Sequence, residues 1–312
     1  MATTGIKGIV VKSTGSWYVV RDEQGNLHPC RLRGKFKLRD VKVSNPLAVG
    51  DKVLFALEEQ GESTAVITEI ESRENYIIRK STHKSAHSHI IAANLDQAFL
   101  VVTLVSPRTS FGFIDRFLVT AEAYQIPVVI IYNKTDLYEA EDQEYQRQIA
   151  NMYANIGYPG IACSTYLNQG LSAIQEQMQA KTTLFSGHSG VGKSTLINAL
   201  VPDLNLKTSK ISAFSDKGVH TTTFAEMYEV NPSTYIIDTP GIKELGIVEI
   251  EKAELGRYFP EIREKMSDCK YHNCLHLKEP GCAVVPAVKA GKISLTRYES
   301  YRSMLEEEDN RR

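Results

Sequence analysis

The chain has 312 residues, which is long for one domain, so two or three domains are expected. Its 42% hydrophobic and 23% charged residues are ordinary for a globular protein, and its net charge of −1 excludes a global field that would attract nucleic acid. No apolar stretch is long enough to span a bilayer, and the first residues lack a signal-peptide core, so we expect a cytoplasmic protein without a membrane partner.

The first 72 residues contain short segments that are rich in Val, Ile and aromatic residues and are separated by turn residues. Five strands are predicted, at residues 6–12, 17–21, 27–33, 52–57 and 63–70. This density of strands predicts a small antiparallel β-barrel as an N-terminal domain, residues 1–72. An OB-fold is the natural candidate, but periodicity does not separate it from an SH3-like barrel.

Basic residues recur along residues 30–43, at nearly every second position. They are Arg31, Arg33, Lys35, Lys37, Arg39 and Lys42, opposed only by Asp40. A strand would place the alternating side chains on one face, where they could contact an RNA backbone. The alternative interpretation is a solvated edge strand protected by its charge.

The next segment, residues 73–96, is polar and basic and is predicted to be a linker at the start of a second domain, residues 73–245. Strands and helices then alternate, as in a doubly wound α/β domain. Strands are expected at residues 98–105, 127–132, 161–164, 183–186, 224–229 and 234–237. Helices are expected at residues 114–124, 139–156 and 171–178 and from residue 193 to 200.

The second of these strands ends at a sequence typical of a guanine-binding loop, Asn133, Lys134, Thr135 and Asp136. The Asp136 carboxylate can accept hydrogen bonds from the ring N–H and the exocyclic amine of guanine, a donor pair that adenine lacks. This selects GTP over ATP and opposes an ATP-dependent enzyme. The segment Cys163-Ser164-Thr165, after the next strand, is expected to supply backbone N–H groups to the guanine oxygen, which makes Ser164 a candidate site residue.

A complete Walker A pattern follows the fourth strand and precedes a predicted helix, which is the context that the pattern requires. It comprises Gly187, His188, Ser189, Gly190, Val191, Gly192, Lys193, Ser194 and Thr195. Its glycines allow backbone N–H groups to converge on phosphate oxygens, and the following helix N-terminus favours negative charge. Lys193 would reach the β- and γ-phosphates, as a catalytic residue, and Ser194 would ligate Mg²⁺.

Two further segments complete the predicted nucleotide site. Asp238, at the end of the last strand, would hold Mg²⁺, and the Gly241 N–H would meet the γ-phosphate. Either Thr221 or Thr222 would complete the magnesium shell, and the sequence does not choose between them. Ile242 occupies the position where many small GTPases orient water with glutamine, so we expect slow intrinsic hydrolysis. Nearby His220 is a candidate catalytic residue that a partner would bring into place; alternatively it is an exposed loop histidine.

The order of these motifs is rotated relative to ordinary small GTPases, in which the phosphate-binding loop precedes the guanine-binding loop. The sequence therefore predicts a circularly permuted GTPase domain.

The last part of the chain, residues 246–312, is expected to be a mainly helical domain around a metal, with a terminal amphipathic helix at residues 295–307. Three cysteines and one histidine lie within fourteen residues: Cys269, Cys274, His276 and Cys282. Four such ligands suit one closed, structural Zn²⁺ site. His272 is a rival ligand, and the spacing favours His276.

Together these features resemble the ribosome small-subunit-dependent GTPase A family, which acts in bacteria late in small-subunit assembly. The resemblance covers nearly the whole chain. It implies an OB-fold, GTP hydrolysis stimulated by the 30S subunit, contact with 16S rRNA, action as a monomer, and release after hydrolysis to GDP. It also places the family's proposed catalytic histidine on His220. Val219 and Thr165 depart from the residues that are usual in the family.

The leading hypothesis is thus an enzyme whose GTP hydrolysis is timed by the 30S subunit. The alternative is an RNA-binding scaffold that holds GTP as a structural ligand with little turnover, which the residue Ile242 keeps open.

Overall fold

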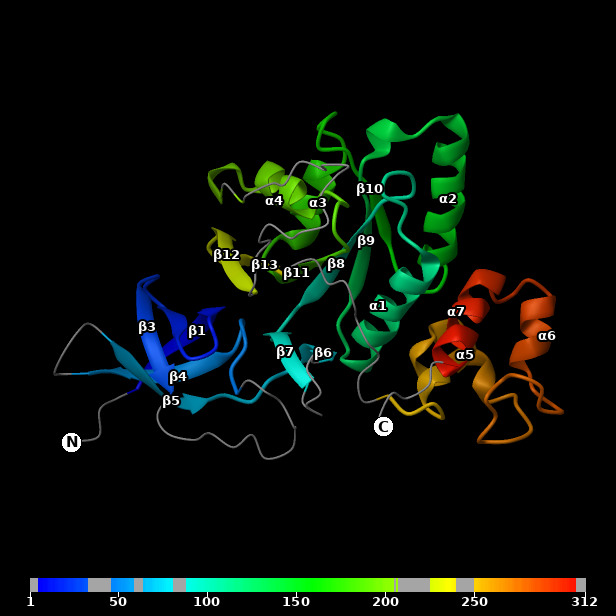
Figure 1. The fold of residues 1–312 in the computed structure, drawn as a ribbon, viewed down its shortest axis with the longest axis horizontal. Coiled ribbons are helices and arrows are strands. Elements are labelled where there is room, and N and C mark those ends of the chain that lie inside the picture. Colours follow the sequence, from blue (N-terminus) through cyan, green and yellow to red (C-terminus); the bar gives the residue numbers. More distant parts are fainter. Residues whose placement is uncertain are drawn as a thin grey trace, which may run out of the picture.

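The computed structural model describes residues 5–32, 46–58, 64–80, 88–204, 206, 225–239 and 250–306. A small barrel, a central α/β domain and a C-terminal helical module follow one another along the chain, with the barrel and the helical module on opposite sides of the central domain (Figure 1). No helix in the described part of the chain is long and apolar enough to cross a membrane.

The N-terminal barrel is built from five strands whose apolar side chains alternate toward a common interior. They are β1 (Ile6–Ser13), β2 (Tyr18–Asp22), β3 (Leu27–Leu32), β4 (Lys52–Leu57) and β5 (Ala65–Ile70). The order β1-β2-β3-β5-β4 is closed by antiparallel pairing of β4 with β1, and β3 pairs with β5 in parallel. This closed five-stranded barrel fits the expected OB-fold. Of the predicted basic strand, Arg31 lies in β3 and the other basic residues lie outside the described residues.

The prediction of a linker at residues 73–96 was wrong. This segment contains a β-hairpin of β6 (Tyr76–Lys80) and β7 (Ser88–Ala93), paired antiparallel. Ile77, Ile78 and Ile90 are fully or almost fully buried, because the hairpin packs against both neighbouring units. The many polar and basic residues between these isoleucines concealed the strand signal.

The central domain contributes six strands, in the order β10-β9-β8-β11-β13-β12, to a sheet that continues from β12 through β1 into the barrel. The strands are β8 (Gln97–Val102), β9 (Val128–Tyr132), β10 (Gly160–Ala162), β11 (Thr182–Ser186), β12 (Glu226–Asn231) and β13 (Thr234–Asp238). All neighbouring pairs are parallel except β12 with β13. The carboxyl ends of the five parallel strands therefore meet at one edge of the sheet, whatever their order in the chain.

Helices cover both faces of this sheet. On one face lie α1 (Phe111–Ala123) and α2 (Ala140–Ala154), and on the other α3 (Leu171–Met178) and α4 (Lys193–Leu200), with short 3₁₀ turns at Thr135–Leu137 and Pro202–Leu204. Side chains of β8 alternate between the two layers: Leu100 packs with the first pair of helices and Val101 with the second. The predicted three-layer α/β domain is confirmed.

The C-terminal module consists of a 3₁₀ turn, Leu255–Tyr258, and the helices α5 (Pro260–Met266), α6 (Val284–Lys289) and α7 (Leu295–Glu306). Its apolar core extends to Val119 of α1, so the module shares a core with the central domain. Helix α7 buries a stripe at helical spacing that includes Tyr298, Tyr301 and Leu305, as expected for an amphipathic helix. Arg297, on the same face, is also buried.

Candidate active site and metal centre

The phosphate-binding loop connects β11 to α4 and ends at Gly192, the residue immediately before the helix. Gly192 has φ of 88°, and a Cβ atom there would lie 2.6 Å from Nδ2 of Asn133. Only glycine fits this position without a shift of its neighbours. The loop is thus pressed against the guanine-binding loop, although the two segments are far apart in the sequence.

Two residues of the predicted guanine-binding loop hold the phosphate-binding loop from outside. Nδ2 of Asn133 donates to the carbonyl of Val191 at 2.8 Å, and Nζ of Lys134 donates to the carbonyl of Gly190 at 2.7 Å. Lys134 also donates to the Ser106 carbonyl at 2.9 Å. Burial lowers the pKa of the Lys134 ammonium. The structure therefore brings the first two predicted motifs into direct contact.

Asp136 lies in the turn after β9, and its side chain is exposed, as a base-binding carboxylate must be. The fully buried Ser164 hydroxyl donates to this carboxylate at 2.5 Å and accepts the Leu167 N–H at 3.1 Å. Within the segment expected to supply backbone N–H groups to the guanine oxygen, the Cys163 N–H donates to the Tyr132 carbonyl and the Ser164 N–H to the Gln169 carbonyl. Ser164 therefore contributes to the site through its hydroxyl, which binds the Asp136 carboxylate, because the chain after β10 folds back on itself. Thr135 connects the guanine-binding loop to the segment that follows β10. Its N–H and its hydroxyl both donate to the Cys163 carbonyl at 3.1 Å.

Lys193 and Asp238 meet at the carboxyl ends of β11 and β13, which are neighbours in the sheet. The Lys193 ammonium donates to the Asp238 carboxylate and to the Thr239 carbonyl, and both side chains are almost fully buried. Burial raises the pKa of the Asp238 carboxyl, and the Lys193 charge opposes this shift. A buried carboxylate of this kind requires a cation beside it. Ser194 is half-buried and Thr195 exposed, both in the first turn of α4.

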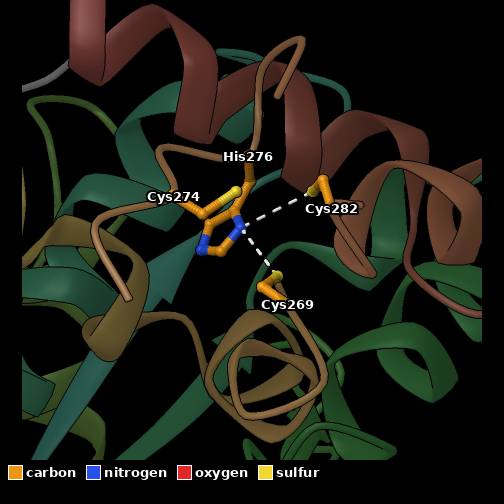
Figure 2. Close-up of side chains that lie close together, drawn as sticks. All are labelled: Cys269, Cys274, His276 and Cys282. Carbon is orange, nitrogen blue, oxygen red and sulfur yellow. Dashed lines mark hydrogen bonds between the residues drawn. The ribbon is translucent and has the colours of Figure 1, made fainter. Parts of the chain in front are cut away.

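The predicted metal ligands converge in the C-terminal module. One ligand atom from each of Cys269, Cys274, His276 and Cys282 can be chosen so that all four lie within 4.8 Å of one another (Figure 2). Nδ1 of His276 lies 3.6 Å from Sγ of Cys269 and 3.7 Å from Sγ of Cys282. Zn–S bonds of about 2.3 Å and a Zn–N bond of about 2.0 Å at a tetrahedral angle separate sulfur from nitrogen by about 3.5 Å, so the cluster fits a metal ion.

The surroundings of this cluster also suit a metal. Burial raises the pKa of the Cys274 thiol to about 12, so a thiolate there needs a cation, and burial lowers the pKa of His276, which keeps its imidazole neutral. The Ala283 N–H donates to Sγ of Cys269 at 3.3 Å. The Glu279 carboxylate accepts three backbone N–H groups of the ligand loop, from Leu275, Leu277 and Lys278. The chain thus contains a Cys₃His site capable of holding a metal, and His272 lies outside it.

Comparison with known families explains this combination of parts. Residues 70–248 match the model of the RsgA GTPase family, and residues 7–65 match that of the RsgA N-terminal domain. The chain belongs to the RsgA GTPase family. It is therefore a GTPase, and the resemblance seen in the sequence is confirmed.

Relatives of similar length support this assignment to the RsgA family. A Bacteroides fragilis protein named small ribosomal subunit biogenesis GTPase RsgA is 53% identical over 97% of both chains, and a Christiangramia forsetii protein of the same name is 50% identical over 98% of both. The crystal structure of YjeQ from Thermotoga maritima matches with a TM-score of 0.78 and 35% identity, covering 99% of this chain and 100% of that one. YloQ, described as a circularly permuted GTPase, matches with a TM-score of 0.73 and 36% identity, covering 97% and 94%. The circular permutation predicted from the motif order is confirmed.

Several predicted residues of this RsgA-family site lie outside the described residues: His220, Thr221, Thr222, Gly241 and Ile242. Their roles remain predictions.

Sequence reasoning missed the loop between β8 and α1, which packs on the phosphate-binding loop. Besides the Ser106 carbonyl, it contributes Pro107, which lies beside Gly190, and Thr109, which contacts His188. The Ser106-Pro107 dipeptide was the only signal available, and it indicates a turn rather than a contact.

Proposed function

We propose that this protein hydrolyses GTP to GDP and phosphate in response to the small (30S) ribosomal subunit, late in the assembly of that subunit. The observation that carries the proposal is the 53% identity, over 97% of both chains, with a relative whose name states small-subunit biogenesis. The contacts between the phosphate-binding and guanine-binding loops support a functional nucleotide site in this chain.

We assign the phosphates of GTP to the loop Gly187–Thr195 and its guanine base to the loop Asn133–Asp136. Asn133 and Lys134 fix the first loop against the second, and Ser164 orients the Asp136 carboxylate toward the base. Lys193 is nearly buried and its ammonium ends beside Asp238, at the edge of the sheet where the γ-phosphate would lie. The N-terminus of α4 adds a favourable dipole.

Ser194, Asp238 and either Thr221 or Thr222 would hold Mg²⁺. This ion neutralises charge on the phosphates when it is bound. The buried Asp238 carboxylate, stabilised by a neighbouring cation, fits this assignment. His220 is assigned the orientation of the attacking water, because Ile242 has no group that can hydrogen-bond to it.

The Cys₃His cluster is assigned one structural Zn²⁺. The sulfur and nitrogen spacing, the neutral imidazole and the N–H donated to a thiolate support this metal. A closed set of four protein ligands leaves no position for water, so the ion would stabilise the module rather than act on GTP.

The remaining assignments rest on family resemblance and on charge. We propose three units, 1–72, 73–245 and 246–312, acting together as a monomer in the cytoplasm. The 16S rRNA is proposed as the partner of the basic segment at residues 30–43.

The test is GTP turnover measured with purified 30S subunits, with 50S subunits and with neither. We expect stimulation by 30S alone, on the order of 10²-fold or more, the contribution of a positioned acid–base group. His220→Ala should retain GTP binding and lose this stimulation, whereas His272→Ala, outside the metal cluster, should retain both. Equal turnover in all three conditions would refute the proposed enzyme and favour the scaffold that only binds GTP.

A further inference from the structure

Three consecutive carbonyl groups of the phosphate-binding loop accept hydrogen bonds from side chains, two from outside the loop and one from within it. Lys134 holds the carbonyl of Gly190 and Asn133 holds that of Val191. The third contact is made within the loop itself: Nδ1 of His188 lies 2.9 Å from the carbonyl oxygen of Ser189. His188 thus adds a third hydrogen-bonded carbonyl, that of Ser189, one residue nearer the start of the loop.

The geometry of the peptide bond links these carbonyls to the phosphate-binding N–H groups. The peptide units of residues 189–192 are trans, so each C=O points away from the N–H of the same unit. Holding the carbonyls of Ser189, Gly190 and Val191 outward directs the N–H groups of Gly190, Val191 and Gly192 to the opposite side. In the described part of the chain these three N–H groups donate to no protein oxygen, so they are available to an anion.

The hydrogen-bond partners of His188 define its tautomer. A carbonyl oxygen only accepts, so Nδ1 carries the proton that is donated to Ser189. Nε2 of the neutral ring then accepts from the Thr109 hydroxyl, which lies 2.8 Å away. Thr109 is nearly buried, and its hydroxyl oxygen accepts the Thr103 N–H at 3.1 Å. Through Thr109, the His188 ring is therefore connected to Thr103, the residue that directly follows β8.

A third contact restricts the imidazole further. The Phe113 ring of α1 meets the His188 ring edge to face, with 5.5 Å between centroids and 89° between planes. The ring is held at Nδ1, at Nε2 and by this aromatic contact, which leaves it one orientation in which to bind the Ser189 carbonyl.

We infer that His188 is a positioning residue for the phosphates of guanine nucleotides: it fixes the Ser189–Gly190 peptide so that the Gly190 N–H faces the phosphate chain. This inference rests on the proposed nucleotide-binding function. It assigns a role to a Walker A position for which the motif prescribes no residue type. The phosphate-binding loop is preorganised on both sides, by the guanine-binding loop at one end and through His188 and Thr109 at the other.

Two substitutions separate the two ring nitrogens. In His188→Asn the amide nitrogen can occupy the place of Nδ1 and still donate to the Ser189 carbonyl. In His188→Gln the amide reaches the place of Nε2 and leaves the Ser189 carbonyl without its donor. We expect His188→Gln to weaken GDP binding roughly tenfold, the effect of one lost hydrogen bond, and His188→Asn to remain within about threefold of the unmodified chain.

Guanosine monophosphate supplies the readout that a general loss of structure would not give. It lacks the second phosphate, so its affinity, measured by competition, should not change in either variant. The ³¹P resonance of the β-phosphate of bound GDP should shift in His188→Gln and not in His188→Asn. Thr109→Val, which leaves His188 in place and removes its tether, should weaken GDP binding less than His188→Gln does. Thermal midpoints without nucleotide check that each variant is folded.

Equal losses of GDP and monophosphate affinity, or an Asn variant as weak as the Gln variant, would overturn the inference. Unchanged GDP affinity in His188→Gln would do the same. If the unmodified chain bound neither nucleotide, the proposed function would fail, and this inference with it.

Discussion

The two junctions of the central domain differ in how they are packed. The C-terminal module is joined to α1 through buried Arg297, whose guanidinium binds Asp115 of α1 at 2.7 Å and both oxygens of Glu261 of α5, and lies over the Phe259 ring. Tyr153 of α2 also donates to Asp115, at 2.8 Å. This junction is dense, charged and excluded from water.

The barrel junction is partly hollow. Beside the hairpin, Arg73 forms a paired hydrogen bond with buried Asp51, at 2.6 and 2.7 Å. Strand β1 pairs antiparallel with β12 at one position, Lys12 opposite Glu226, and Ile9 and Val11 of β1 are only partly buried against the central core. The polar contacts there are ion pairs of partly exposed side chains, Lys12 with Glu226 and Arg21 with Glu229. A cavity of about 430 Å³ beside Arg21 is lined by the barrel and by Met227 and Tyr235 of the central domain.

This difference between the two junctions indicates which flanking unit depends on the central domain for its stability. Removing one partner from a buried ion pair leaves an uncompensated charge, whereas an exposed ion pair contributes little. The C-terminal module and the central domain should therefore unfold together, and the barrel should tolerate change at its β1–β12 contact.

The largest effect is expected from loss of the proposed zinc. In Cys274→Ser, or with a strong chelator, we expect the C-terminal module to unfold and to lower the thermal midpoint of the central domain, because the two share a core. Metal content and the unfolding curve are the measurements. Cys30→Ser, the same change in the barrel core, should retain about one zinc per chain. A metal-free Cys274→Ser protein with the original midpoint would contradict the packed junction.

The next effect is expected at Arg297. Arg297→Met leaves two buried carboxylates without their guanidinium partner. It should lower the free energy of unfolding by about 3–5 kcal/mol in denaturant titrations. Arg263→Met is the matched control, because Arg263 joins α5 to Glu122 of α1 as an exposed pair, and its cost should stay below about 1 kcal/mol. Adding Asp115→Asn and Glu261→Gln to Arg297→Met should recover part of the loss. Similar costs for both arginines would show that burial does not distinguish these contacts.

A smaller effect is expected at the hollow junction. Arg21 pairs with Glu229 and also contacts the Tyr235 ring. A double-mutant cycle of Arg21→Ala and Glu229→Ala should give a coupling free energy of about 0.2–1 kcal/mol, because both side chains are partly exposed. A coupling well above this range would place the barrel junction in the same class as the C-terminal one.

The smallest effect is expected on the barrel rim at Asp22, which lines the cavity. A hydrogen bond from the His28 ring, aided by Asn26, lowers the Asp22 pKa to about 2. A depressed carboxyl pKa stabilises the fold above its unfolded value of about 3.9, and this contribution disappears as the pH falls through about 2. The difference in thermal midpoint between the unmodified chain and Asp22→Asn should therefore be present at pH 5 and vanish near pH 2. A difference that persisted at pH 2 would assign the effect to packing.

Much of the fold could be predicted because local patterns carry it. The bounds of α3 and those observed for α4 agree with the predicted segments, and β8 and β9 begin and end within a few residues of theirs. The hairpin of β6 and β7 was missed because its burial depends on two neighbouring units rather than on its own composition.

The candidate site likewise has features that the sequence predicts and contacts that only the structure shows. Residue types and their spacing predicted the phosphate-binding loop, the guanine-binding loop and the metal ligands. They gave no indication that the Ser164 hydroxyl would bind Asp136, or that His188 would reach Thr109, 79 residues earlier in the chain. Such partners become neighbours only when strands from different parts of the chain pair.

The sequence by itself determined the kinds of domain, the family and the chemistry available, because periodicity, glycine placement and ligand spacing are local properties. The tertiary structure decided which carbonyls are held, which charges are buried and which junction is hollow. Those outcomes depend on contacts between distant segments, where burial rather than residue type sets the free energy of each interaction.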